Sequence, residues 1–176
     1  MSQFIRLFLF FGAVVTSLAA CAAQYQRQTH PEEHFVIEYL TSWKPYSGKH
    51  NASFSIPDHS KADVSIRVYP RAQEDSATAE AYIARFIEVV KQEGGQLNGK
   101  DIIQVSGRAA TKLEFAVANG WGPVTGVSII IPDGPQYYVA SLHGKEADVT
   151  AVRPQFDRLV VSLRLGPMPK SLKEIH

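Results

Sequence analysis

The sequence of 176 residues contains a single cysteine and almost no excess of either charge. One cysteine excludes a disulfide within the chain, so the fold cannot depend on disulfide cross-links. The 18 Lys and Arg residues balance 17 Asp and Glu residues. This balance argues against nucleic acid as a partner, because nucleic-acid surfaces need clustered positive charge. No run of like charges, low-complexity stretch or internal repeat divides the chain, which favours one globular domain.

The apolar segment near the N-terminus is too short to span a bilayer. Arg6 supplies a positive charge, the residues from Leu7 to Val15 carry none, and small residues precede Cys21. This order is typical of a secretory signal, so we predict a signal peptide over residues 1–20. A buried core thiol is the alternative for Cys21, but it would leave the apolar N-terminus unexplained.

The tetrad Leu18-Ala19-Ala20-Cys21 resembles the lipobox of bacterial lipoproteins. The resemblance implies cleavage before Cys21, a diacylglycerol thioether on its sulfur and an acyl chain such as palmitate on its amine. One chain binds a bilayer marginally, at about 0.8 kcal/mol per buried methylene, whereas two or three chains anchor a protein stably. Ala22 in place of an aspartate implies the outer membrane, facing the periplasm, in a Gram-negative cell. In a Gram-positive cell it implies the outer face of the single membrane.

Residues 21–33 are expected to comprise the lipidated cysteine and, from Ala22 to Glu33, a short polar tether. From Phe35 onward the pattern changes to the period of two that is typical of half-buried strands. Strands are expected over residues 35–39, 53–56, 63–68, 102–106, 109–117, 124–131 and 136–142. Glycine and proline turns separate most of these segments.

Two segments have helical periodicity instead. The first helix is expected to begin after Asp75 or Ser76 and to end at Gly94 and Gly95. Its apolar stripe consists of Tyr82, Ile83, Phe86, Val89 and Val90. The second helix is expected to begin near Pro154, which suits a first helical position, and its stripe consists of Phe156, Leu159, Val160 and Leu163. Strands joined mostly by short turns, with two helices, predict an α+β fold. Its antiparallel sheet of about six to seven strands would be flanked by helices over residues 34–165, followed by a tail over 166–176.

Three segments resemble the PsbP-like family. They are the opening strand and turn at 35–43, the strand-turn-strand at 105–110 and the closing helix at 156–164. Leu40 stands where the family has proline, and Leu163 where it has an aromatic residue. The family includes the extrinsic photosystem II subunit, a Ran-binding nuclear factor and bacterial lipoproteins. The resemblance implies an α-β-α sandwich and mostly non-enzymatic binding or assembly roles.

Three short motifs contain residue types of ligand or catalytic sites. Segment 94–101 has the glycine and lysine spacing of a phosphate loop, but it follows a helix and precedes a strand, so a helix C-cap and turn is expected. Segment 30–34 offers two imidazoles and two carboxylates, but Pro31 disfavours the helix that would bring them together, so a solvated tether is expected. Segment 58–60 contains triad residue types that cannot align within one turn. We predict no catalytic residue, no metal site and no cofactor.

Aromatic residues in turns are the remaining candidates for a partner surface. Trp43, Tyr46 and Trp121 lie in turn-rich segments, where binding residues are frequent, and aromatic anchors are typical of partner surfaces. The alternative for each tryptophan is a ring that caps an end of the core, and Trp43 matches a packing position of the family.

The sequence therefore predicts a lipid-anchored extracytoplasmic protein with a non-catalytic binding, scaffold or assembly role in the cell envelope. Its expected partners are the membrane, through lipidated Cys21, and a protein or other envelope component. Two alternatives stay open. A small-ligand-binding lipoprotein would contain a sizeable apolar pocket with a few polar groups, and an envelope enzyme would use a site that no motif reveals.

Overall fold

The structure is a computed structural model that describes residues 24–33, 35–59, 61–70, 78–119, 122–134 and 136–166. The predicted signal peptide, Cys21 and nearly all of the predicted tail lie outside this part of the chain. No helix among the described residues is long and apolar enough to cross a bilayer.

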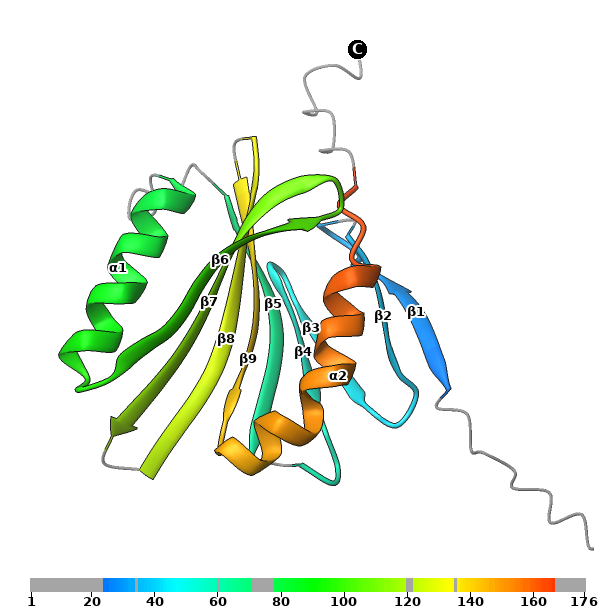
Figure 1. Cartoon of the computed structure of the whole chain (residues 1–176). Coiled ribbons are helices and arrows are strands. Elements are labelled where there is room, and N and C mark those ends of the chain that lie inside the picture. Colours follow the sequence, from blue (N-terminus) through cyan, green and yellow to red (C-terminus); the bar gives the residue numbers. More distant parts are fainter. Residues whose placement is uncertain are drawn as a thin grey trace, which may run out of the picture.

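Seven antiparallel strands form the central sheet, and a separate hairpin lies beside it (Figure 1). In spatial order the strands of the sheet are β3 (Lys44–Gly48), β4 (Asn51–Ser55), β5 (Ala62–Pro70), β9 (Gln136–Gly144), β8 (Gly122–Asp133), β7 (Arg108–Asn119) and β6 (Gln96–Val105). The hairpin pairs β1 (Tyr25–Thr29) with β2 (Val36–Leu40). The predicted antiparallel sheet and α+β class are confirmed.

Two helices cover opposite faces of the sheet, α1 (Ala79–Gln92) on one and α2 (Glu146–Ser162) on the other. Thr78, rather than Asp75 or Ser76, caps α1, because its hydroxyl accepts a hydrogen bond of 3.1 Å from the Ala81 amide. Asp75 and Ser76 lie outside the described residues. Gly94 follows α1 with a φ of +71°, as the predicted C-cap requires.

The predicted start of α2 is wrong. The helix begins at Glu146, and Pro154 lies inside it. Val152 and Val149 are buried one and two turns before Phe156, so the apolar stripe continues toward the N-terminus. Burying each of these side chains stabilises the helix by about 1.5 kcal/mol or more, which offsets the backbone hydrogen bond that proline cannot donate.

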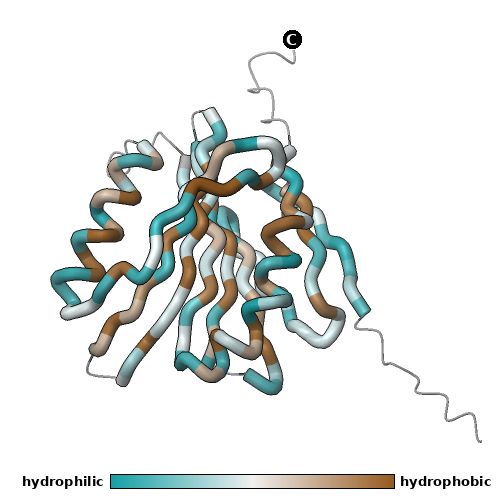
Figure 2. Tube along the Cα trace, viewed as in Figure 1, coloured by the Kyte–Doolittle hydropathy of each residue, from teal (hydrophilic) through white to brown (hydrophobic). Residues whose placement is uncertain are grey.

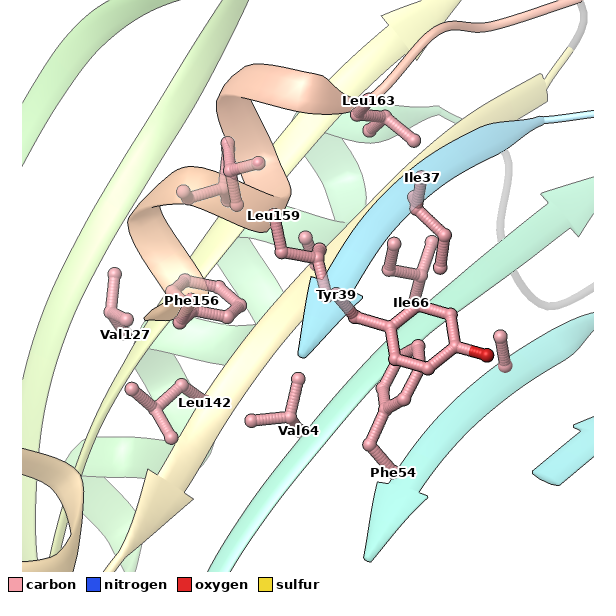
Figure 3. Packing of buried hydrophobic residues seen from close by; sticks show 14 of the residues in the cluster. Ile37, Tyr39, Phe54, Val64, Ile66, Val127, Leu142, Phe156, Leu159 and Leu163 are labelled. Carbon is pink, nitrogen blue, oxygen red and sulfur yellow. The ribbon is translucent and has the colours of Figure 1, made fainter. Parts of the chain in front are cut away.

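The larger core lies between α2 and the sheet. Hydrophobic and polar residues alternate along the central strands (Figure 2), and the hydrophobic set faces α2. Phe156, Leu159 and Leu163 of the α2 region are fully buried against residues that include Val64 and Leu142 (Figure 3).

The second core is smaller and lies under α1. Tyr82, Ile83 and Phe86 pack against the sheet as predicted, together with Ile87. Val89, which the predicted stripe included, is 45% exposed because it lies on the solvent side of the helix. The predicted stripe therefore wrongly included Val89 and omitted Ile87.

The β1–β2 hairpin occupies most of the segment that was predicted to be a tether. β1 pairs with β2, and the Phe35, Ile37 and Tyr39 side chains enter the α2 core. The motif at 30–34, predicted to be solvated, contains a buried residue: His30 is only 2% exposed. A polar strand was not recognisable in the sequence because β1 itself contributes almost no apolar surface.

His30 joins the β1–β2 hairpin to the β3–β4 hairpin. Its Nδ1 accepts hydrogen bonds from the amides of Glu32 and Glu33 at 3.3 and 3.0 Å. Its Nε2 lies 3.0 Å from the Gly48 carbonyl oxygen and 3.2 Å from that of Asn51. This pattern assigns the ring proton to Nε2, with every polar atom of the ring satisfied. His30 is therefore a structural residue of the hairpin junction.

We predict that His30→Ala lowers the free energy of unfolding by about 2–3 kcal/mol, because the change opens a cavity and leaves buried backbone groups without partners. Chemical denaturation of the purified protein measures this loss. His143→Ala is the matched control and should cost much less, because His143 is only half-buried. Equal stability of the His30→Ala variant and the unchanged protein would contradict a structural role of His30 at the hairpin junction.

Tyr138 is expected to make the stability of the α2 core depend on pH in the alkaline range. Its side chain is 1% exposed, and its hydroxyl accepts a hydrogen bond from Gln136 at 2.8 Å. Burial, with the Asp133 carboxylate nearby, raises the pKa of Tyr138 to about 12. In the unfolded chain a tyrosine titrates near pH 10. The stability that this difference provides is fully present below about pH 10 and is lost as the pH rises toward about 12.

The free energy of unfolding should accordingly fall by up to about 1.4 kcal/mol per pH unit above pH 10 on account of Tyr138. Denaturant titrations at several alkaline pH values measure the slope. Tyr138→Phe should make it shallower, whereas Tyr46→Phe should not, because Tyr46 is exposed. An identical slope in Tyr138→Phe would show that ionisation of this hydroxyl does not cause the loss of stability at alkaline pH.

Candidate binding surface

The face of the sheet opposite α2 is only half covered. α1 packs on β6, β7 and β8, and no other described helix lies on that side. Among the described residues, β3, β4, β5 and part of β9 therefore have no helix over this face. We call this region the open face.

A row of four serines crosses the open face and continues onto β8, next to α1. Ser53 of β4 pairs with Ser65 of β5, Ser65 with Ser141 of β9, and Ser141 with Ser128 of β8. The hydroxyl oxygens of Ser128 and Ser141 lie 3.2 Å apart. Tyr46 of the edge strand β3 stands opposite Ser53 and is 59% exposed. The serines thus form a polar floor that runs from an exposed tyrosine toward α1.

Larger side chains rise around this floor and make two shallow grooves. The groove next to α1 has a volume of about 260 Å³ and is lined by Ser65, Ser128 and Ser141 together with Arg67, Tyr69, Tyr82, Phe86, Phe115, Val139 and His143. The groove next to β3 has a volume of about 480 Å³ and is lined by Tyr46, Ser53, Phe54, Ser55, Lys61, Ala62, Asp63, Val124, His143 and Gly144. His143 lines both, so the grooves form one continuous surface.

Gly126 allows two walls of the groove to approach each other. It stands opposite both Phe115 and His143 in the sheet. A Cβ at this position would lie 2.6 Å from the Phe115 ring and 2.8 Å from the His143 Cβ. Any larger residue at position 126 would therefore push one of these side chains away and change the shape of the groove.

Aromatic rings form the α1 end of the open face. Tyr69 and Tyr137 stack at 5.0 Å between ring centroids, and Tyr82 lies 5.3 Å from Tyr69. Burial, reinforced by Tyr69, raises the pKa of Tyr82 far above its usual range. The Tyr82 hydroxyl is therefore neutral at physiological pH and provides a neutral polar group at the rim of the groove.

The open face contains triad residue types without triad geometry. Asp63 stands opposite His143 in the sheet, and Ser141 lies two residues before it. Within the described part of the chain, no hydrogen bond joins the His143 ring to a carboxylate or a hydroxyl. His59 from the 58–60 motif pairs instead with Asp148 of α2, at 3.2 Å. The described residues also form no cluster of metal ligands.

The predicted partner residues have separate locations. Trp43 is 4% exposed and packs on Phe54 with ring centroids 5.7 Å apart, so the core-capping interpretation is confirmed for it. Tyr46 lies at the margin of the open face. Trp121 follows β7 in the sequence and lies outside the described residues. The lipobox residue Cys21, near the N-terminus, also lies outside them.

Sequence reasoning found the polar alternation of the strands but not the open face. Ser65 lies between Val64 and Ile66, and Ser128 between Val127 and Ile129. These positions predict a solvent-facing side of each strand, but they do not tell which serines become neighbours. Strand order and register supply that information.

Comparison with solved structures finds the same fold in proteins of low sequence identity. The cyanobacterial PsbP protein CyanoP from Synechocystis sp. PCC 6803 matches with a TM-score of 0.61 and 15% identity, over 88% of this chain and 100% of that one. The Ran-binding protein Mog1p of Saccharomyces cerevisiae matches with a TM-score of 0.58 and 10% identity, over 82% of this chain and 96% of that one. PA94, a Pseudomonas aeruginosa protein of unknown function, matches with a TM-score of 0.51 and 20% identity, over 84% of this chain and 99% of that one.

No family model and no curated protein matches the sequence. At such low identities a structural likeness establishes the fold and not the activity. The sequence resemblance and the structure agree on this point: the chain has a PsbP-like α+β fold.

Proposed function

We propose that this protein is a lipid-anchored extracytoplasmic binding protein, which holds a protein partner on its open face at the membrane surface. The observation that carries the proposal is the half-covered sheet. A sheet face that no helix of the described residues covers, lined by polar groups and continuous over two grooves, is suited to contact another macromolecule. The lipobox, with Cys21 as the acylated residue, supplies the anchor.

The shape of the open face favours a protein over a small ligand. Small-molecule sites are mostly apolar concavities that surround most of their ligand. The two grooves are shallow instead, and hydroxyls, Arg67, Asp63 and His143 line much of them. Tyr46 adds an exposed aromatic ring at one margin, which is a residue type enriched at protein interfaces. A protein surface with hydroxyl, amide and acidic groups would match this composition.

The role that we propose is non-catalytic. General acid–base chemistry requires a base held by a second group and aimed at its target. His143 has no such orienting hydrogen bond among the described residues, and the His59–Asp148 pair joins a loop to a helix on the other side of the sheet. Binding and positioning of a partner need neither arrangement.

Cys21→Ser should prevent acylation and release the protein from membranes. The measurement is the distribution of the protein between membrane and soluble fractions after a high-salt wash, with mass spectrometry of the N-terminal peptide to detect the acyl chains. Ala22→Ser is the matched control and should remain acylated and membrane-bound. A Cys21→Ser variant that stays in the membrane fraction would contradict the anchor.

Replacing both Tyr46 and Arg67 with alanine should weaken partner capture at least tenfold, equivalent to about 1.4 kcal/mol, because interface aromatic and arginine residues carry much of the binding energy. Crosslinking of the anchored protein in cells, followed by quantitative mass spectrometry, measures capture. Both side chains are exposed, so the melting temperature should hardly change. Arg85→Ala, on the solvent side of α1, is the matched control. If the folded double variant still captured the partner equally well, the open face would be excluded as the partner-binding surface.

A further inference from the structure

A second surface, on the opposite side of the sheet, concentrates positive charge beside the N-terminal strand. Arg27 of β1 and Arg158 and Arg164 of the α2 region line a groove of about 280 Å³, together with Glu38, Val161 and Ser162. We call this the arginine groove. Figure 1 shows the hairpin of β1 and β2 alongside α2, which brings these residues together.

The charges of the three guanidinium groups are not neutralised by ion pairs among the described residues. None of them forms an ion pair with a carboxylate among the described residues, and Glu38 is the only acidic residue that lines the groove. Arg108 and Arg153, by contrast, pair with Asp133 and Glu114 at 2.9 and 2.8 Å. The arginine groove therefore carries a net positive charge that no ion pair among the described residues neutralises.

Two of the guanidinium groups are held in place. The Arg158 guanidinium carbon lies 3.6 Å from the centre of the Tyr25 ring, in a cation–π contact. The Arg164 Nη1 donates to the carbonyl oxygens of Val161 and Leu163 at the end of α2, at 2.9 and 3.0 Å. Their remaining N–H groups are free to contact an anion. A planar guanidinium with free donors matches phosphate oxygens well.

The groove is also close to the proposed anchor. Tyr25 begins β1 and contacts Arg158, and Cys21 precedes it by four residues. Four residues span at most about 14 Å. A lipidated Cys21 would lie at the bilayer interface, so Tyr25 and Arg158 would stand at or next to the lipid headgroups. Val161, which is 74% exposed at the rim of the groove, adds an apolar side chain to the same surface.

We propose that the arginine groove binds the phosphate groups of anionic lipids in the bilayer to which the protein is anchored. This inference rests on the proposed lipid anchor and adds an orientation to it. The central sheet separates the arginine groove from the open face, so docking through the groove turns the open face away from the bilayer. A flexibly tethered domain thereby becomes one that presents its binding surface to the aqueous side.

The test uses the acylated full-length protein in vesicles of phosphatidylcholine alone and in vesicles with about one third phosphatidylglycerol. Hydrogen exchange of the peptides that contain β1 and the end of α2 reports contact with the bilayer. We expect exchange in these peptides to slow severalfold in the anionic vesicles only, and the effect to disappear in 0.5 M salt, because the Debye length then falls to only a few ångströms. Exchange in α1 should not change.

A triple variant should abolish the difference in hydrogen exchange between the two vesicle types. It combines Arg27→Gln, Arg158→Gln and Arg164→Gln. The corresponding triple lysine variant should largely keep this difference, because each cation near an anionic surface contributes severalfold in affinity. Arg85→Gln is the control. A melting temperature for each variant, measured in neutral vesicles, separates lost binding from lost folding.

Equal exchange in neutral and anionic vesicles would overturn the arginine groove as a lipid site while leaving the anchor intact. Protection by inorganic phosphate in neutral vesicles, without any effect of phosphatidylglycerol, would overturn it in favour of a soluble anion. A protein that carries no acyl chain would instead refute the proposed anchor, and this is read from the mass of the N-terminal peptide before the vesicle experiment begins.

Discussion

The burial of one face of the sheet under α2 is the constraint on which the rest of the structure depends. The central strands direct alternate residues to that face, so the intervening residues are directed to the other one. Val64, Ile66, Val127 and Leu142 are all fully buried on the α2 side. The polar row from Ser53 to Ser128 is the geometric consequence on the opposite side. Ser65 and Ser128 of this row are only 5% and 2% exposed, and among the described residues α1 covers only part of the face.

The β1–β2 hairpin completes the α2 layer and lies shortly after Cys21, the residue of the proposed anchor, in the sequence. Its inner side chains extend the core, and His30 clamps its turn to the β3–β4 hairpin. The outer side of the same hairpin carries Arg27 next to Arg158 and Arg164. One structural element thus contributes to the core and to the positive charge of the arginine groove.

The open face and the arginine groove lie on opposite sides of the seven-stranded sheet, which gives the proposed functions a spatial order. Positive charge beside the N-terminal strand suits a surface of lipid phosphates, and hydroxyls with an exposed tyrosine suit a protein. The two surfaces share no lining residue. A partner on the open face could therefore be held while the other side of the domain contacts the bilayer.

Local sequence patterns determined much of this protein by themselves. The alternation around Val64 to Val68, the stripe of α1 and the turn at Gly107 depend on neighbours in the chain, so the α+β class and most strands were predictable. The lipobox prediction for Cys21 likewise rests on sequence alone. Tertiary structure decided the features that depend on distant residues. α2 continues through Pro154 because Val149 and Val152 are buried. β1 is a strand because its backbone pairs with β2. His30 is buried because a second hairpin supplies its acceptors. The four serines and the three arginines become neighbours only through strand order and the packing of α2, which the period of a sequence pattern does not encode.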